Sequence, residues 1–168
     1  MVKFAVHLDH GVESHIFDAI DSGSYDSVMI DASHDDFCQN VKRTRSVVEK
    51  AKANRIFVEA ELGVLSGVED DISVDEKMAK YTHPDEALQF VNETQCNSLA
   101  IAVGTSHGAY KFSGGQGIQF DILQKIQKLL PEFPLVLHGG SSVDLEEVKK
   151  INNSGGMLEK TASGVDPE

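Results

Sequence analysis

The sequence predicts an α/β fold built on a parallel sheet, and two observations lead to this prediction. Short runs of apolar residues recur along the chain, and segments with helical periodicity separate them. Alternation of this kind is typical of β–α–β units, whose strands run parallel. The intervals between the runs match the length of one unit of a barrel or of a doubly wound sheet.

Five apolar runs are the expected strands. They are rich in Val, Ile, Leu and Ala, and their near-continuous hydrophobicity is typical of strands that are covered on both faces. The runs cover residues 3–8, 27–32, 56–62, 99–104 and 134–139.

Four segments between these runs are the expected helices, covering residues 12–23, 35–54, 83–95 and 121–130. In the second helix, an apolar stripe runs from Phe37 to Ala51 with the spacing of a helix that lies on a sheet. Asp35 or Asp36 is expected to cap its start, and Pro84 is expected in the first turn of the next helix. Neither a GxGxxG nor a GxxxxGK[ST] pattern follows the first strand, so no nucleotide-binding fingerprint is present there.

The composition bounds the function. A chain of 168 residues is long enough for one domain with a sizeable core, and we treat residues 1–168 as one domain. A formal net charge of -12 argues against nucleic acid and anionic membranes as partners, although it allows a small phosphorylated ligand. No apolar run approaches a membrane span, and Cys38 and Cys96 form no CxxC pattern. We therefore expect a soluble cytoplasmic protein with reduced thiols.

Polar residues gather where the predicted strands end. Because the carboxyl ends of parallel strands share one face, which is where α/β proteins form their active sites, these residues are expected to meet. They include Asp9 and His10, Asp31 and Ser33, Glu59 and Glu61, residues 104–107, and His138 with Gly139.

Three histidines in this set are each followed by glycine: His10, His107 and His138. Glycine allows the backbone to turn sharply and to approach a ligand closely. Three imidazoles that converge beside carboxylates match a catalytic zinc site, which leaves one coordination position for water or substrate. The alternative is that each histidine is only a hydrogen-bonded residue at a strand end, but the shared context of all three favours a metal.

The carboxylates allow several roles. Asp9, beside His10, could act as a general acid or base, orient an imidazole, or simply cap a loop. Asp31, Glu59 and Glu61 lie inside apolar strands, where a carboxylate needs a cation or several donors. Glu59 and Glu61 could orient a ligand, hold a second metal or pair with a lysine. Glu61 is favoured near the metal because it lies closer to the strand end.

Three loops are candidate parts of the site. Residues 65–77 form a long acidic connection without apolar periodicity, in which Glu69 could be a mobile base. Residues 105–117 and 138–142 combine glycines and hydroxyls, and the first also carries Lys111. Exposed amides of such loops form anion-binding concavities.

The motifs "HLDHG", "VMIDAS", "VEAELG", "GTSHGAYKF" and "LVLHGGSS" occur in the order found in one family. Together they resemble the class II, metal-dependent fructose-bisphosphate aldolases and their tagatose-bisphosphate relatives. The resemblance implies a partial (β/α)8 TIM barrel of about five parallel strands that lacks the first two strands and the last. It also implies a glycolytic lyase, which reversibly cleaves fructose 1,6-bisphosphate to dihydroxyacetone phosphate and glyceraldehyde 3-phosphate, and a dimer or tetramer at full length.

The resemblance also assigns roles by position. His10, His107 and His138 match the catalytic zinc ligands, and Asp9 matches the proton donor and acceptor for the C4 hydroxyl. Asp31 and Glu61 match residues that can hold a second or displaced metal, and Glu69 resembles a loop glutamate that moves a proton. The remaining matches, to contacts with substrate phosphate and with a monovalent cation (Na⁺ or K⁺), are Gly108, Gly139, Gly140 and Ser141.

The chemistry agrees with the residue types. No lysine lies in an apolar strand where it could form a Schiff base, so a metal is expected to act as the electron sink. The alternatives are a tagatose-bisphosphate aldolase, a truncated metal-binding remnant without activity, and a metal-dependent hydrolase. The glycine-flanked loops of the phosphate-binding type argue against the hydrolase.

Overall fold

A computed structural model of the chain describes residues 3–64, 66–69, 72–74, 80–107, 117–140, 143 and 145–153. Its main sheet has five strands, and every neighbouring pair is parallel. The strands are β1 (His7–Leu8), β2 (Ser27–Ile30), β3 (Phe57–Leu62), β6 (Ser98–Ile101) and β8 (Leu135–Val136). All five lie within or within one residue of the predicted apolar runs, so the predicted parallel sheet is confirmed.

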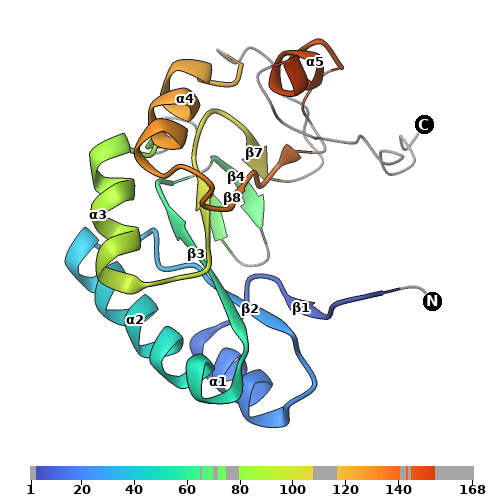
Figure 1. Cartoon of the computed structure of the whole chain (residues 1–168), viewed down its shortest axis with the longest axis vertical. Coiled ribbons are helices and arrows are strands. Elements are labelled where there is room, and N and C mark those ends of the chain that lie inside the picture. The colour runs from blue at the N-terminus through green and yellow to red at the C-terminus, as the bar shows by residue number, and fades with distance from the viewer. Residues whose placement is uncertain are drawn as a thin grey trace.

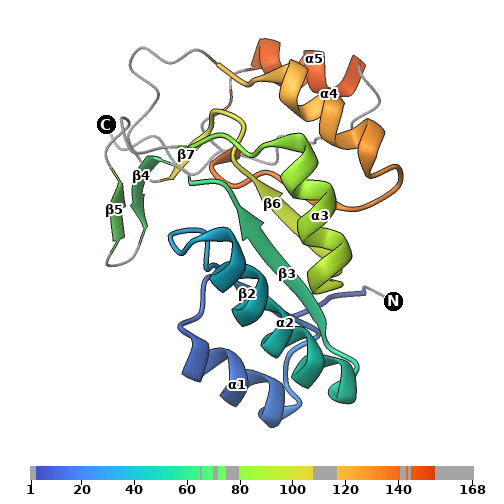
Figure 2. The same ribbon diagram turned by 90° about the vertical axis from the view of Figure 1, so that its left-hand side faces the viewer.

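The helices follow the strands in turn and cover one face of the sheet, as Figures 1 and 2 show for α1 to α4. The helices are α1 (Glu13–Ser22), α2 (Phe37–Asn54), α3 (Pro84–Thr94), α4 (Phe120–Leu129) and α5 (Leu145–Asn153). The first four correspond to the four predicted helices, whereas α5 was not predicted.

The strand order distinguishes a barrel from a doubly wound sheet. The order β1-β2-β3-β6-β8 follows the chain without reversal. A doubly wound sheet reverses its direction at a switch point and places helices on both faces. Right-handed crossovers that always add the next strand on the same side instead place the helices on one face, as in a (β/α)8 barrel. The fold is therefore part of such a barrel.

The predicted signals at the helix ends hold for α2 and α3. The Asp36 carboxylate accepts a hydrogen bond of 3.0 Å from the backbone N–H of Gln39 and so caps α2. Pro84 begins α3, where its missing N–H leaves no helical hydrogen bond unmade. The stripe predicted along α2 is largely buried against the sheet, including Val47 and Ala51.

Alternation along β3 separates the core from a polar face. Val58, Ala60 and Leu62 are buried in the hydrophobic core beneath the helices. Glu59 and Glu61 alternate with them and therefore point to the opposite face of the sheet. This polar face is the one that a closed barrel would turn inward.

A second, smaller sheet departs from the prediction. Residues 65–77 were expected to be an irregular connection, but they contain β4 (Ser66–Glu69) and β5 (Ile72–Val74), which pair antiparallel. β4 also pairs in parallel with β7 (Ser106–His107). That partner comes from a distant part of the chain, and strands this short leave no periodic signal in the sequence.

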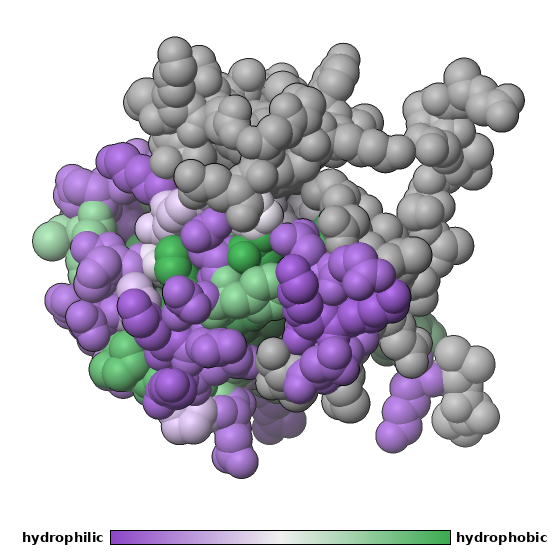
Figure 3. All heavy atoms as spheres, turned by 90° about the horizontal axis from the view of Figure 1, so that it is seen from above, coloured by the Kyte–Doolittle hydropathy of each residue, from purple (hydrophilic) through white to green (hydrophobic). Residues whose placement is uncertain are grey.

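The surface agrees with the composition. Among the residues that Figure 3 colours, most are hydrophilic, and a smaller hydrophobic area lies between them. No helix among the described residues is long and apolar enough to cross a bilayer. Cys38 is exposed, Cys96 is buried, and both are free thiols, as predicted.

Candidate functional site

Two of the three predicted histidines meet at the carboxyl ends of the strands. His10 follows β1 and His138 follows β8, the two outermost strands of the five-stranded order. Their ring centroids nevertheless lie 4.8 Å apart, with the rings at 89°. In a flat sheet four strand spacings would separate the two edges by about 19 Å. The sheet therefore curls until its edges face each other, as a barrel wall does.

The turn after β1 places Asp9 and His10 together. His10 has a φ of 50°, in the left-handed region, which breaks the alternation of the strand. As a result the Asp9 Oδ1 atom lies 2.8 Å from His10 Nδ1. A Cβ at the next position would lie 2.9 Å from the Leu8 side chain and 3.0 Å from that of Ile16, so Gly11 lets this turn pack closely.

Glu61 is the buried carboxylate of the site. Its side chain is 2% exposed, and its Oε2 atom lies 3.4 Å from His10 Nε2. Burial raises the pKa of Glu61 to about 7, a shift that interaction with His10 opposes and the charge of Asp31 reinforces. A carboxylate with so high a pKa lacks the positive charge that burial of its ionised form requires.

His138 is held by the other glutamate of β3. Its Nε2 atom lies 2.8 Å from Glu59 Oε1, and both side chains are 12% exposed. Burial lowers the pKa of His138, but the hydrogen bond to Glu59 and the charges of Glu61 and Glu59 outweigh it, so that the pKa is raised overall. Glu61 thus lies beside His10, and Glu59 lies beside His138.

The donor atoms fit a divalent cation. Ligand atoms of Asp9, His10 and His138 all lie within 4.8 Å of one another, and so do those of His10, Asp31 and Glu61. Glu61 Oε2 is buried, and the described residues offer it no hydrogen bond of good geometry. Two donors on a tetrahedral zinc ion are separated by about 3.3 Å, close to the 3.4 Å between Glu61 Oε2 and His10 Nε2.

The structure describes some of the other predicted site residues fully, some only in their backbone, and some not at all. Asp31 follows β2, and its Oδ1 atom accepts a hydrogen bond of 2.9 Å from the Ser33 amide. Gly139 has a φ of 67°, and Gly140 follows it in the turn after His138. Only the backbone is described for His107 in β7 and for Glu69 in β4. Gly108, Lys111 and Ser141 lie outside the described residues. The convergence of all three histidines on one ion therefore stays a prediction.

The sequence reasoning assigned no role to His7 and Ser27, and it left the role of Glu59 open. His7 Nδ1 lies 2.7 Å from Ser27 Oγ, and His7 Nε2 lies 3.9 Å from Glu59 Oε2. Strand periodicity could have placed His7 on the face of Asp9, two residues on. The pairing of β1 with β2, which brings Ser27 beside His7, has no such signal.

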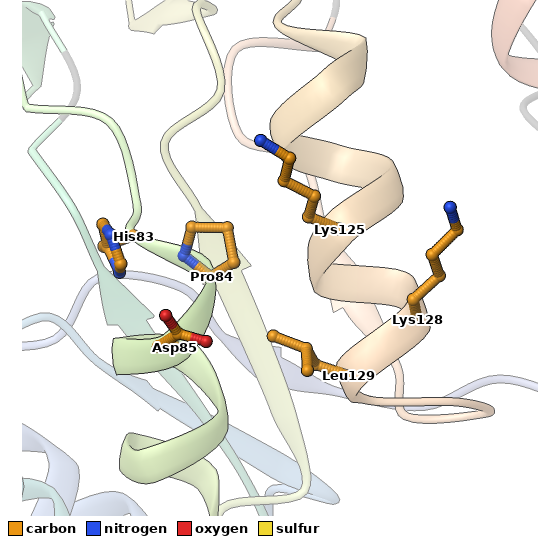
Figure 4. A pocket seen from close by; sticks show the side chains of 6 residues that line it. All are labelled: His83, Pro84, Asp85, Lys125, Lys128 and Leu129. Atoms are coloured by element: carbon orange, nitrogen blue, oxygen red, sulfur yellow. The ribbon is translucent and has the colours of Figure 1, made fainter.

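A separate pocket lies between two helices. It has a volume of about 360 Å³ and is formed by the start of α3 and the last turns of α4, as Figure 4 shows. Its lining residues are His83, Pro84, Asp85, Lys125, Lys128 and Leu129. None of them is among the predicted site residues, and the helices α3 and α4 supply most of the lining.

Comparison with known proteins identifies the family. The family model of class-II fructose-bisphosphate aldolases matches residues 1–157. Fructose-bisphosphate aldolase of Thermus caldophilus is 49% identical over 168 residues, which span 99% of this chain and 54% of that protein. The Helicobacter pylori enzyme is 46% identical over 164 residues, spanning 98% of this chain and 53% of its own length. The chain thus spans about half the length of these curated relatives.

Solved structures agree with this result. A protein from Coccidioides immitis, assigned as a candidate fructose-1,6-bisphosphate aldolase, superposes with a TM-score of 0.79 at 35% identity. The match covers 90% of this chain and 53% of that one. The YdjI aldolase of Escherichia coli gives a TM-score of 0.67 at 32% identity, covering 86% of this chain and 47% of its own. The chain therefore belongs to the class-II fructose-bisphosphate aldolase family.

Proposed function

We propose that the protein catalyses metal-dependent aldol cleavage and condensation of fructose 1,6-bisphosphate. The observation that carries this proposal is the meeting of His10 and His138, in reach of Asp9 and Glu61, at the strand ends of an aldolase-family barrel. The two imidazoles and His107 would hold a zinc ion, and Asp31 and Glu61 would hold a second or displaced position of the metal. When bound, the cation would polarise the C2 ketone of the substrate and stabilise the negative charge that develops there.

The side chains of the site then divide the remaining work. The Asp9 carboxylate is 60% exposed, so a substrate at the rim of the barrel can reach it. In cleavage, Asp9 takes the proton of the C4 hydroxyl while C4 becomes the carbonyl carbon of glyceraldehyde 3-phosphate. The electron pair of the C3–C4 bond passes toward C2, giving the enediolate of dihydroxyacetone phosphate. Glu69 would return a proton to C3, which completes the second product.

The turns that follow the ligands are suited to the substrate phosphates. Gly139 and Gly140 directly follow His138, and the left-handed φ of 67° at Gly139 turns the backbone there. Together with Gly108, Lys111 and Ser141 they would bind a phosphate group and a monovalent cation, Na⁺ or K⁺. We also propose that the protein is cytoplasmic and forms a dimer or tetramer, as the family resemblance implies.

The decisive experiment combines a coupled cleavage assay with metal analysis of the purified chain. We expect zinc to be retained, cleavage of fructose 1,6-bisphosphate to be lost after treatment with a chelator, and activity to return when zinc is added. Absence of cleavage by the zinc-loaded chain contradicts the proposal. Zinc binding without cleavage supports instead a metal-binding protein without turnover.

Two substitutions separate the roles of neighbouring residues. Asp9→Ala should retain zinc but lower cleavage by about 10²- to 10⁴-fold, the usual contribution of a general acid or base. His10→Ala should instead lose zinc, because a ligand is gone. Equal zinc content in the two variants would contradict this division. Parallel assays with tagatose 1,6-bisphosphate test the alternative substrate, which differs at C4.

A further inference from the structure

We propose that Glu59 is a positioning residue for the metal site. It would accept the Nε2 proton of His138 and thereby leave the Nδ1 lone pair of that ring as the donor for a bound cation. This inference rests on the proposed function, because it concerns a ligand of the metal proposed there. It assigns a role to a carboxylate to which the proposed function gives none.

The contact joins two elements that are not neighbours in the sheet. Glu59 lies in β3 and His138 follows β8, with β6 between them. On β6, Ser98 pairs with Glu59 and Ala100 pairs with Glu61. Because both residues of β6 on this face are small, the glutamate can reach over the strand to the imidazole. The resulting Oε1 to Nε2 distance is 2.8 Å.

The chemistry of the two groups determines which ring nitrogen is left for the metal. An ionised carboxylate only accepts hydrogen bonds, so His138 must donate from Nε2. In the neutral imidazole the other nitrogen then carries the lone pair that a metal requires. Glu59 is 12% exposed, so little water competes for the contact. Carboxylates that hold a metal-binding histidine in this way fix both its tautomer and its orientation.

Glu59 is itself supported from the other side. Its second oxygen, Oε2, lies 3.9 Å from His7 Nε2, and His7 Nδ1 lies 2.7 Å from Ser27 Oγ. His7 and Ser27 are paired residues of β1 and β2, so this support is built into the sheet. A chain of polar groups from three strands thus converges on His138.

The two glutamates of β3 therefore serve different imidazoles. Glu61 directs Oε2 toward His10 at 3.4 Å, whereas Glu59 directs Oε1 toward His138 at 2.8 Å. Residues two apart in a strand point to the same face and are separated by one pleat along it. This spacing lets two residues of β3 contact the histidines that follow the two outer strands, β1 and β8.

The test uses the full chain and two measurements. Nitrogen NMR of the metal-free protein reports the tautomer of His138, and competition with a chromogenic chelator reports zinc affinity. In the parent we expect the Nε2–H tautomer. Glu59→Ala should give a mixture of tautomers and weaken zinc binding by about 10- to 100-fold. Glu59→Gln, whose amide oxygen can still accept the proton, should recover most of both properties and preserves the shape of the side chain.

The control is Glu49→Gln, which removes the same charge from an exposed glutamate that accepts a hydrogen bond from Arg45. It should change neither measurement. An unchanged His138 tautomer in Glu59→Ala, or an unchanged zinc affinity in that variant, overturns the positioning role. A parent chain that binds no zinc overturns the proposed metal site instead, and the tautomer measurement still decides the role of Glu59.

Discussion

At the scale of one residue, the buried carboxylate of Glu61 needs either a proton or a nearby positive charge. Its carboxylate is 2% exposed and faces His10, with Asp31 and His138 as the other charged groups near it. Burial raises its pKa from 4.5 to about 7, so the metal-free folded protein holds a proton that the unfolded chain releases. A bound cation would supply the charge that this carboxylate otherwise takes up as a proton.

This difference sets the sign of a pH dependence. Because the folded state binds more protons, the free energy of unfolding of the metal-free protein should fall as pH rises from 4.5 to about 7. The total loss from Glu61 is about 3 kcal/mol. The raised pKa of His138 acts in the same direction above pH 6.5. Zinc affinity should change oppositely, increasing with pH as the competing protons leave.

Urea unfolding of the metal-free protein at several pH values measures the effect. In the Glu61→Gln variant, the free energy of unfolding should fall less with pH in this window than in the parent, because the glutamine amide does not titrate. Subtracting the free energy of unfolding of the variant from that of the parent at each pH cancels the pH dependence that the other acidic residues cause in both proteins. A parent and a variant with parallel curves between pH 5 and pH 7 would contradict the assignment to Glu61.

At the scale of the element, the stability of α2 depends on the hydrogen bond that caps its first turn. Asp36 caps the helix through the Gln39 amide, and the helix packs against the sheet between α1 and α3. Replacing Asp36 by Ala leaves this amide without its side-chain partner and should lower the free energy of unfolding by about 1 kcal/mol.

Denaturant unfolding tests this prediction, with Asp18→Ala as the matched control. Asp18 lies on the exposed side of α1, and its replacement should change stability by no more than about 0.5 kcal/mol. Similar losses in both variants would show that removal of any acidic side chain, rather than loss of the cap, is responsible.

At the scale of the whole molecule, the described sheet has two outer strands. β1 pairs with β2 and β8 pairs with β6, and the order does not close among the described residues. Beside β1, Phe4 is 87% exposed and Val6 is 39% exposed. Outer strands flanked by exposed apolar residues tend to pair with other chains.

We therefore expect the chain to self-associate as its concentration rises. Phe4→Lys should weaken this association without changing stability, because a side chain so exposed contributes little to the core. Sedimentation velocity across a concentration series measures the effect, and Phe57→Lys, at a side chain that is 63% exposed on β3, tests whether the position matters. Equal effects of the two substitutions would contradict a role for the β1 edge.

Much of this protein could be predicted from its sequence, because its signals are local. Apolar runs predict the five strands. The apolar stripe and the aspartate cap predict α2, Pro84 predicts the start of α3, and the polar residues after each run predict where a site lies. These features depend on periodicity and on residues near each other in the chain. The five motifs also indicate the family, which the comparisons confirm.

Only the tertiary structure decided which side chains meet. The contact between His10 and His138 depends on the curl of the sheet, and that of Glu59 with His138 depends on the small residues of the strand between them. The pairing of β4 with β7 was missed for the same reason. Register and curvature arise from packing among distant segments, so no local pattern in the sequence encodes them.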